Sequence, residues 1–280
     1  MLLDSERWQI VRPAYPLTEA HVALRLRSGS PNDQPTPDVA ADLAHVYRAA
    51  QAGLHAVLGC DGFGLSFAWS WVPYGSGIGE PVPESGQPTV HVFGRSRVER
   101  VKPVRVMALP LHERPAPMSP AEQEDLDRRL SPAFATAEPI PPPGPEVDPA
   151  TCDGCVPSVE REQELWRADG VRVLRPRAPL VEASVLVMPL RHVVSPAALH
   201  PQEIMSYAER LREVRAGFAH RHGSTGLSCF LNDGPRAGQE TPHVHVHVFG
   251  RAVDEPQNPF EVLARRIGAR GTLTRWGLGR

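Results

Sequence analysis

The sequence predicts an α+β fold that is built twice along one chain of 280 residues. Each half contains an amphipathic helix, a strand with the segment Gly-Leu-Ser, and a later strand that ends Val-His-Val-Phe-Gly-Arg. This last hexapeptide is identical in the two halves, at residues 90–95 and 246–251. Six identical residues in the same place after a matching helix and strand indicate an internal duplication. The length also suits two domains of ordinary size.

In each half a proline marks the start of the helix. Thr36 and Pro37 are typical of a helix cap and first turn, and apolar residues then recur at helical spacing as far as Val57. Pro201 opens the second helix, whose apolar face extends to Phe218. The strands that follow are expected at residues 64–69 and 90–95 in the first half, and at 226–231 and 246–251 in the second.

A proline-rich stretch separates the halves. Residues 139–145 read Pro-Ile-Pro-Pro-Pro-Gly-Pro, and proline at this density blocks regular helix and sheet and favours extended chain. We therefore expect a first domain over residues 1–114 and a linker over 115–150, with room for one short solvated helix at 122–130. The second domain, with a C-terminal tail, is expected over 151–280.

Composition limits the classes of function. A formal charge of −2 gives no support for a nucleic acid or an anionic membrane as the main partner. No apolar run approaches the roughly 18 residues that a transmembrane helix needs. Residues 1–12 have neither the basic start nor the apolar stretch of a signal peptide, so we expect a cytoplasmic protein. Lys102 is the only lysine, which excludes a Walker A loop and argues against Schiff-base chemistry.

Three histidines alternate near the end of the second half. Side chains at i, i+2 and i+4 of a strand share a face, so His243, His245 and His247 should point one way while the intervening valines enter the core. Neutral imidazole can be a nucleophile, a proton carrier, a metal ligand or a phosphate donor. Three on one face are too polar for a packed core and indicate a functional site. In the first half Thr89 and Gln87 stand where His245 and His243 do, so that copy has lost two of them.

A polar loop precedes these histidines. Residues 232–239 read Asn-Asp-Gly-Pro-Arg-Ala-Gly-Gln. Glycines let backbone N–H groups approach an anion, and the amides of Asn232 and Gln239 can donate to phosphate oxygens. Most loops of this composition are only turns, but beside the histidines this one indicates a phosphate-handling site.

Cys152 and Cys155 form a C-x-x-C pair, and the other two cysteines are isolated, which is not the pattern of a disulfide-stapled secreted domain. A C-x-x-C can be a redox pair, half of a zinc site or accidental. This pair does not lie at a strand-to-helix junction of thioredoxin type, and histidines follow in the same half. We therefore favour zinc held by two thiolates and two imidazoles, with His192 and His243 as the best candidates for the imidazoles.

Together these segments closely resemble the histidine-triad (HIT) family of nucleotide-phosphate hydrolases and transferases. The matching segments are Leu-Val-Met-Pro-Leu-Arg-His at residues 186–192, the loop at 232–239, and Pro-His-Val-His-Val-His-Val at 242–248. The last contains the family motif His-φ-His-φ-His-φ-φ, where φ is apolar. The resemblance covers about residues 152–251, and residues 15–95 are a degenerate echo of it.

The resemblance implies two antiparallel five-stranded sheet units with helices. Such units normally pair as a homodimer whose sheets join, and a duplicated chain can form that pseudo-dimer within itself, which leaves a further homodimer open. The implied partner is a small molecule: a nucleotide, a phosphate ester or a phosphoramidate.

The resemblance also implies roles for individual residues. His245 would be the nucleophile that attacks an α-phosphorus and forms a phosphohistidine-type intermediate, which water or a second acceptor then resolves. His247, Asn232 and Gln239 would hold the non-bridging oxygens as charge builds in the transition state. Zinc-containing members place a structural zinc at the positions of Cys152, Cys155, His192 and His243, without contact to substrate.

One segment departs from the family pattern. Typical nucleotide-binding members carry an acidic residue before the Pro-x-x-His segment, where it grips the ribose, whereas residues 173–179 read Val-Leu-Arg-Pro-Arg-Ala-Pro. This weakens the expectation of an ordinary nucleoside but not that of a phosphate. Arg175 and Arg177 either meet an extra phosphate or carboxylate or are solvated surface residues.

Three functions follow from these observations. The first is a nucleotidyl hydrolase or transferase with His245 as nucleophile, which the intact triad favours. The second is a non-catalytic protein that binds a nucleotide or phosphoester, which the missing carboxylate favours. The third is a metal-dependent enzyme that uses the triad histidines as metal ligands, but the C-x-x-C and the polar loop fit the first better.

Overall fold

The computed structural model describes residues 1–30, 33–71, 79–263 and 265, and its centre is one ten-stranded sheet. The strand order is β1-β2-β3-β5-β4-β9-β10-β8-β7-β6, and neighbouring strands are antiparallel. Five of these strands come from the first half of the chain and five from the second. The predicted α+β fold of two five-stranded units joined within one chain is therefore confirmed.

The strands and helices alternate in a similar order in the two halves. The strands are β1 (Leu3–Asp4), β2 (Trp8–Val11), β3 (His21–Leu26), β4 (Gly62–Trp69), β5 (Thr89–Arg95), β6 (Glu164–Ala168), β7 (Val171–Leu174), β8 (Ser184–Pro189), β9 (Gly226–Asp233) and β10 (Val246–Arg251). The α-helices are α1 (Pro37–Leu58), α2 (Pro103–Met107), α3 (Pro120–Thr136), α4 (Pro157–Glu162) and α5 (Pro201–His222). Short 3₁₀ turns are η1 (Leu111–Glu113), η2 (Pro149–Thr151), η3 (Pro196–Ala198) and η4 (Pro235–Ala237).

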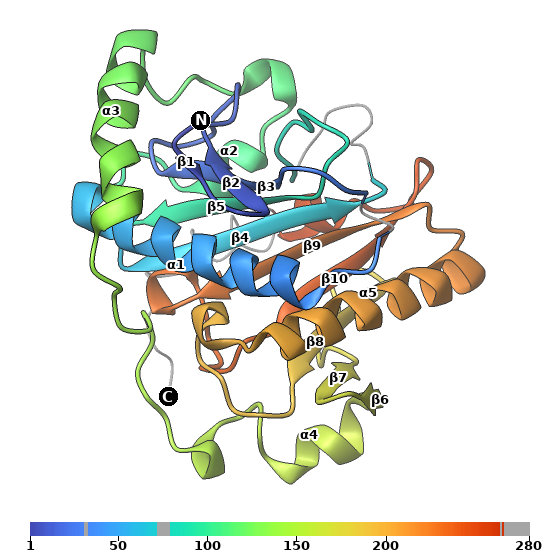
Figure 1. Cartoon of the computed structure of the whole chain (residues 1–280). Coiled ribbons are helices and arrows are strands. Elements are labelled where there is room, and N and C mark those ends of the chain that lie inside the picture. The colour runs from blue at the N-terminus through green and yellow to red at the C-terminus, as the bar shows by residue number, and fades with distance from the viewer. Residues whose placement is uncertain (31–32, 72–78, 264, 266–280) are drawn as a thin grey trace.

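The helices α1 and α5 lie side by side over one face of the sheet (Figure 1). Each has 22 residues, begins at a proline and ends at a glycine with φ of 64°, Gly59 and Gly223 respectively. Glycine adopts this left-handed conformation without strain, which is why both helices stop there. Apolar side chains from both helices and both halves of the sheet form one continuous core between them. Among the helices of the described residues, none combines the length and apolar character needed to cross a bilayer.

The two halves join where β4 pairs with β9. The register runs from Phe63 opposite Asp233 to Trp69 opposite Leu227, so its centre is the pair Ser66 and Phe230. A pseudo-twofold axis through this pair relates β4 to β9. It makes Gly62, the first residue of β4, equivalent to Gly226, the first residue of β9. The shared Gly-Leu-Ser segments are therefore offset by two residues in space. Because side chains alternate with a period of two, this offset leaves every side chain on the expected face.

The proline-rich segment contains more structure than the sequence suggests. Helix α3 is longer than the short solvated helix expected at 122–130, and its residues Leu126, Leu130 and Phe134 are buried. A capping box between Ser119 and Glu122 starts the helix. The apolar residues recur every four positions, so they form one stripe that packs on α1. The boundaries of the two domains and the linker stay a prediction, and most of the expected C-terminal tail, residues 264 and 266–280, lies outside the described residues.

Candidate functional site

The four predicted metal ligands lie together in the second half of the chain. The Sγ atom of Cys155 lies 3.3 Å from Nδ1 of His243 and 3.4 Å from Nδ1 of His192, and Cys152 Sγ lies 4.0 Å from His243 Nδ1. All four ligand atoms lie within 4.8 Å of one another. Tetrahedral zinc with ordinary bond lengths separates its ligand atoms by about 3.3 to 3.8 Å. The donor set therefore fits zinc, and its widest separations exceed this range by only about 1 Å, which a small movement of the side chains would close.

The tight turn that presents the two thiols depends on Gly154. A Cβ atom on this residue would lie 3.0 Å from Met188 Cε and 3.1 Å from His243 Nδ1, which is closer than side chains normally pack. Arg172 is buried beneath the turn and donates to the carbonyl of Gly154. Nothing in the sequence marks Arg172, among the residues of its buried strand, as a contact of this turn.

Without a metal, the cluster combines a protonated thiol with a neutral imidazole. Burial raises the pKa of the Cys155 thiol to about 11, since a buried thiolate near Cys152 lacks solvation, although Arg172 opposes the rise. Burial, together with the neighbouring His192 and the positive charge of Arg172, lowers the pKa of His243 to about 4, so this imidazole is neutral at neutral pH. A bound divalent cation would favour the thiolates and neutral imidazoles that ligation requires.

The tautomer of His243 also fits ligation. Its Nε2 lies 3.1 Å from the carbonyl oxygen of Arg191. This places the proton on Nε2 and leaves the Nδ1 lone pair facing the sulfur atoms. His243 is completely buried, and the Nε2 atom of His192 finds no hydrogen-bond partner among the described residues.

His243 and His247 lie in different surroundings. Strand β10 begins only at Val246, so His243 and His245 precede the strand that was expected to carry all three. The N–H of Val244 donates to the carbonyl of Val193, 2.7 Å away, rather than extending the pairing with β8. This detour takes the His243 ring into the cysteine cluster, so it does not share an open face with His247.

His245 is held by its own chain. Its Nδ1 lies 2.7 Å from the carbonyl oxygen of His243. A carbonyl only accepts, so Nδ1 carries the proton and Nε2 keeps a lone pair. Burial lowers the pKa of His245, which keeps the ring neutral and the lone pair available. An imidazole in this state can act as a nucleophile or a base.

His247 packs against an aromatic floor. Its ring lies 4.4 Å from that of Phe230, with 7° between the ring planes, and 5.1 Å from the ring of His245. Burial and the neighbouring His245 lower the pKa of His247 to about 3. The same face of β10 continues through Phe249 to Arg251. The contact between Phe230 and His247 could not be read from the sequence, because the two residues belong to different strands, β9 and β10.

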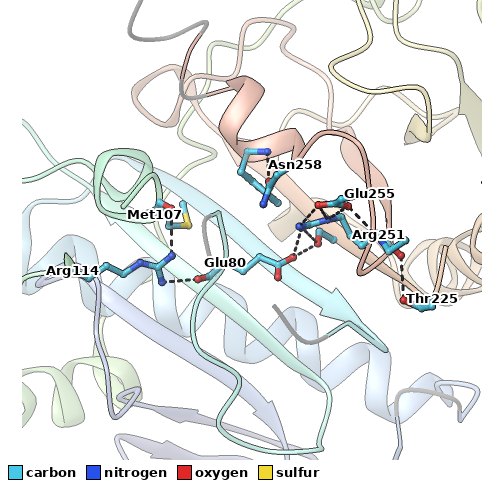
Figure 2. A network of polar contacts seen from close by, with 10 residues as sticks. Glu80, Met107, Arg114, Thr225, Arg251, Glu255 and Asn258 are labelled. Atoms are coloured by element: carbon cyan, nitrogen blue, oxygen red, sulfur yellow. Dashed lines mark hydrogen bonds and ion pairs between the residues drawn. The ribbon is translucent and has the colours of Figure 1, made fainter. Parts of the chain in front are cut away.

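Arg251, on the face of β10 that carries His247, forms an ion pair with a residue of the first half of the chain. Its Nη1 lies 3.0 Å from Glu80 Oε1, which also accepts from the hydroxyl of Ser228, and both charged side chains are buried (Figure 2). The guanidinium also pairs with Glu255 and lies 4.6 Å from the centroid of the Trp71 ring. The face that carries His247 is thus bounded by residues from both halves.

The polar loop at 232–239 folds back on itself. The N–H of Gly234 donates to Gln239 Oε1 at 2.7 Å, and Gln239 Nε2 donates to the carbonyl of Val194 at 2.9 Å. The amide of Asn232 donates to the carbonyl of Gly238 at 3.3 Å. In this structure both side-chain amides shape the loop, and each NH₂ group uses one of its two N–H donors in these bonds. Their predicted contact with phosphate oxygens stays a prediction.

The equivalent positions of the first half differ in chemistry. The Gln87 side chain donates to the carbonyl of Arg27, and Thr89 donates to that of Gln87. His91 Nδ1 lies 3.0 Å from Nε2 of the buried His21. Within residues 1–30, 33–71 and 79–263, the only cluster of three or more potential metal ligands is the one in the second half. Arg175 and Arg177 are both exposed, which is compatible with either of their two interpretations.

The class of protein follows from a family comparison. Residues 159–254 match the HIT domain family, so the second half of the chain contains a HIT domain and the predicted resemblance is confirmed there. A bis(5'-adenosyl)-triphosphatase of Saccharomyces cerevisiae is 27% identical over 119 residues, which make up 41% of this chain and 57% of the relative. The similarity thus spans little more than half of that enzyme.

Solved structures extend the likeness to both halves. A uridylyltransferase has a TM-score of 0.53 and 14% identity, with 97% of this chain and 87% of the other covered. An ADP-glucose phosphorylase from Arabidopsis thaliana has a TM-score of 0.52 and 10% identity, with 90% of this chain and 74% of the other covered. At these identities the likeness shows the fold alone, and it extends over the first half of the chain as well as the second.

Proposed function

We propose that the chain is a nucleotidyl hydrolase or nucleotidyltransferase that uses His245 as its nucleophile. The observation that carries the proposal is the 2.7 Å contact between His245 Nδ1 and the carbonyl of His243. It leaves a neutral imidazole with its Nε2 lone pair free. The HIT domain match and the names of the relatives, a bis(5'-adenosyl)-triphosphatase, a uridylyltransferase and an ADP-glucose phosphorylase, support a nucleotide as the substrate class.

The reaction would proceed in two displacements. Nε2 of His245 attacks the α-phosphorus, and a P–N bond forms as the bond to the leaving group breaks. The ring becomes positively charged, and its Nδ1–H donates more strongly to the His243 carbonyl, which stabilises the intermediate. Water or a second acceptor then attacks phosphorus, the P–N bond breaks, and His245 returns to the neutral state. Two smaller barriers replace one large one.

Neighbouring donors would hold the reacting phosphate. His247 and the remaining N–H groups of Asn232 and Gln239 can donate to the non-bridging oxygens, where charge builds in the transition state. Arg175 and Arg177 are candidates for a further anionic group of the substrate.

A structural zinc held by Cys152, Cys155, His192 and His243 would act through the backbone. His243 offers its ring to the cluster and its carbonyl to His245, so anchoring the ring also fixes the acceptor that orients the nucleophile. Bound zinc would supply rigidity here rather than chemistry on the substrate. The same geometry counts against the metal-dependent alternative, because the His243 ring lies against Cys152 and Cys155 and does not share a face with His247.

The test is turnover and trapping with the purified chain. Diadenosine triphosphate, ADP-glucose and adenosine phosphoramidate serve as probes. His91→Ala is the control, because His91 is a histidine of the first half at the place that corresponds to His247, and the position of His245 is taken there by Thr89. We expect His245→Ala to abolish turnover and to remove a phosphorus-linked adduct that mass spectrometry maps to His245 in the parent chain. Full activity of His245→Ala, or an adduct at another residue, would exclude covalent catalysis at His245. Tight nucleotide binding without turnover would favour the non-catalytic binding protein.

A further inference from the structure

A buried aspartate joins the first half of the chain to the loop of the second. Asp233 ends β9 and is completely buried. Its Oδ2 accepts from the Tyr47 hydroxyl at 2.5 Å, from Gln51 Nε2 at 2.7 Å and from the Ser195 hydroxyl at 2.9 Å. Tyr47 and Gln51 come from α1 in the first half, whereas Ser195 lies just before η3 in the second.

Within the described residues, the pseudo-symmetric position in the other half has no hydrogen-bond network like that of Asp233, although it also lies at the junction of the two halves. The position of the first half that corresponds to Asp233 is Trp69, because each lies seven residues after the first residue of its strand. On α5, Leu211 stands where α1 has Tyr47. Trp69 instead contacts a guanidinium, that of Arg212, 5.6 Å from its ring centroid. The carboxylate network is thus present only on the side of the polar loop.

The network holds the same two segments that Gln239 joins. Asp233 lies between Asn232 and Gly234, whose N–H donates to Gln239 Oε1. Ser195 follows Val194, whose carbonyl accepts from Gln239 Nε2. The segment next to Ser195 also anchors the approach to the nucleophile, since the carbonyl of Val193 accepts from Val244. Asp233 therefore connects α1 to both walls of the loop.

The burial of the Asp233 carboxyl group opposes folding. Burial of a carboxyl group opposes ionisation and raises the pKa of Asp233 to about 7, in spite of three hydrogen bonds that lower it. The second oxygen, Oδ1, finds no hydrogen-bond partner among the described residues. An aromatic contact like that of Trp69 with Arg212 would join helix and strand without the desolvation of a carboxylate.

We propose that Asp233 is a positioning residue, through which Tyr47 and Gln51 of α1 hold the loop at 232–239 in its working geometry. The first half, which lacks two of the triad histidines, thus serves the single site of the second half as a positioning unit. The effect on turnover rests on the proposed function, but the effect on the loop itself does not.

The experiment compares two tyrosines on equivalent helices. Tyr47→Phe removes one donor to Asp233. Tyr207→Phe is the matched control, because Tyr207 is buried on α5 and its hydroxyl finds no hydrogen-bond partner among the described residues. Asp233→Ala and Asp233→Asn complete the set, since asparagine keeps one accepting oxygen. Hydrogen exchange of the Gly234 and Gln239 amides is measured by mass spectrometry, alongside kcat, KM, melting temperature and zinc content.

We expect Tyr47→Phe and Asp233→Ala to raise exchange in the loop by about tenfold or more, the effect of losing one hydrogen bond to a charged group. They should lower kcat by a similar factor and change KM less, because a loop that stabilises the transition state affects kcat first. Asp233→Asn should recover part of both effects, and Tyr207→Phe should match the parent chain.

Loop exchange in Tyr47→Phe and Asp233→Ala that equals the Tyr207→Phe control would overturn the proposal. So would a fall in kcat that tracks only the loss of folded or zinc-loaded protein. If the parent chain turns over none of the nucleotide probes while loop exchange still rises in these variants, the proposed function fails and the positioning role stands.

Discussion

The ring of Phe230 lies 4.4 Å from that of His247, and the two planes differ by only 7°. Phe230 belongs to the central pair of the β4–β9 junction, opposite Ser66. The aromatic floor of the site therefore lies on the pseudo-symmetry axis, where the first half has a serine in the equivalent place. This difference, together with the contact of His91 with His21, gives His247 and His91 different environments.

Replacing Phe230 with alanine should raise the pKa of His247. The pKa of this ring is about 3 because it is shielded from water, so hydration in Phe230→Ala should move the pKa toward the ordinary value near 6.5. NMR titration of the imidazole measures this directly. Phe67→Ala, on the helix-covered face of β4, is the control and should leave the titration unchanged. A pKa of His247 that stays near 3 in Phe230→Ala would show that Phe230 does not shield it.

His247→Ala should be milder than His245→Ala. The first change removes one donor to the transition state, an effect on the order of 3 kcal/mol or about a hundredfold in kcat, whereas the second removes the nucleophile. Zinc content should be nearly unchanged in both variants, because neither residue belongs to the cysteine cluster. Steady-state kinetics and metal analysis on the same samples separate the two effects. Equal losses of rate would contradict the assigned roles.

The cysteine cluster should hold one zinc per chain. Cys155→Ala should lose the metal and lower the free energy of unfolding, since a bound structural metal contributes directly to folding. Cys60→Ala is the control, because Cys60 is a buried thiol in the first half, outside the cluster. Metal analysis and denaturant unfolding provide the measurements. Purified protein with no zinc and with both Cys152 and Cys155 free to react would remove the prediction.

His91 should make the fold sensitive to acid without affecting the rate. Its folded pKa is about 4, lowered by burial and by Arg25, against about 6.5 when unfolded. The unfolded state therefore binds the extra proton, and this stability is present above pH 6.5 and is lost as the pH falls toward 4. His91→Gln should reduce the slope of stability against pH in that window by up to about 1.4 kcal/mol per pH unit. Equal slopes in both proteins, or a slower enzyme, would contradict this.

The sequence contained enough to predict the cysteine cluster but not the polar networks around it. The C-x-x-C and the Pro-x-x-His segment have fixed local spacings, so their chemistry can be read without a structure. Asp233 has no such signal, because its donors Tyr47 and Gln51 lie 186 and 182 residues away in the chain. Helix α3 was underestimated because its apolar stripe lies among prolines that suggest extended chain. The detour of His243 depends on Val193, which only the folded chain brings near Val244.

Asp233→Asn should reveal a pH dependence opposite in sign to that of His91. The pKa of Asp233 is raised by burial to about 7 in the folded chain, against about 3.9 when unfolded. The folded state therefore holds the proton more tightly, and this contribution is complete below about pH 4 and is lost as the pH rises through 7. Relative to Asp233→Asn, which cannot ionise, the parent chain should lose up to about 1.4 kcal/mol of stability per pH unit across that window. Denaturant unfolding of both proteins between pH 4 and 8 measures the difference, from which titrations common to the two chains cancel. A difference independent of pH would mean that Asp233 ionises in the folded chain as readily as in water, and that its three hydrogen bonds offset its burial.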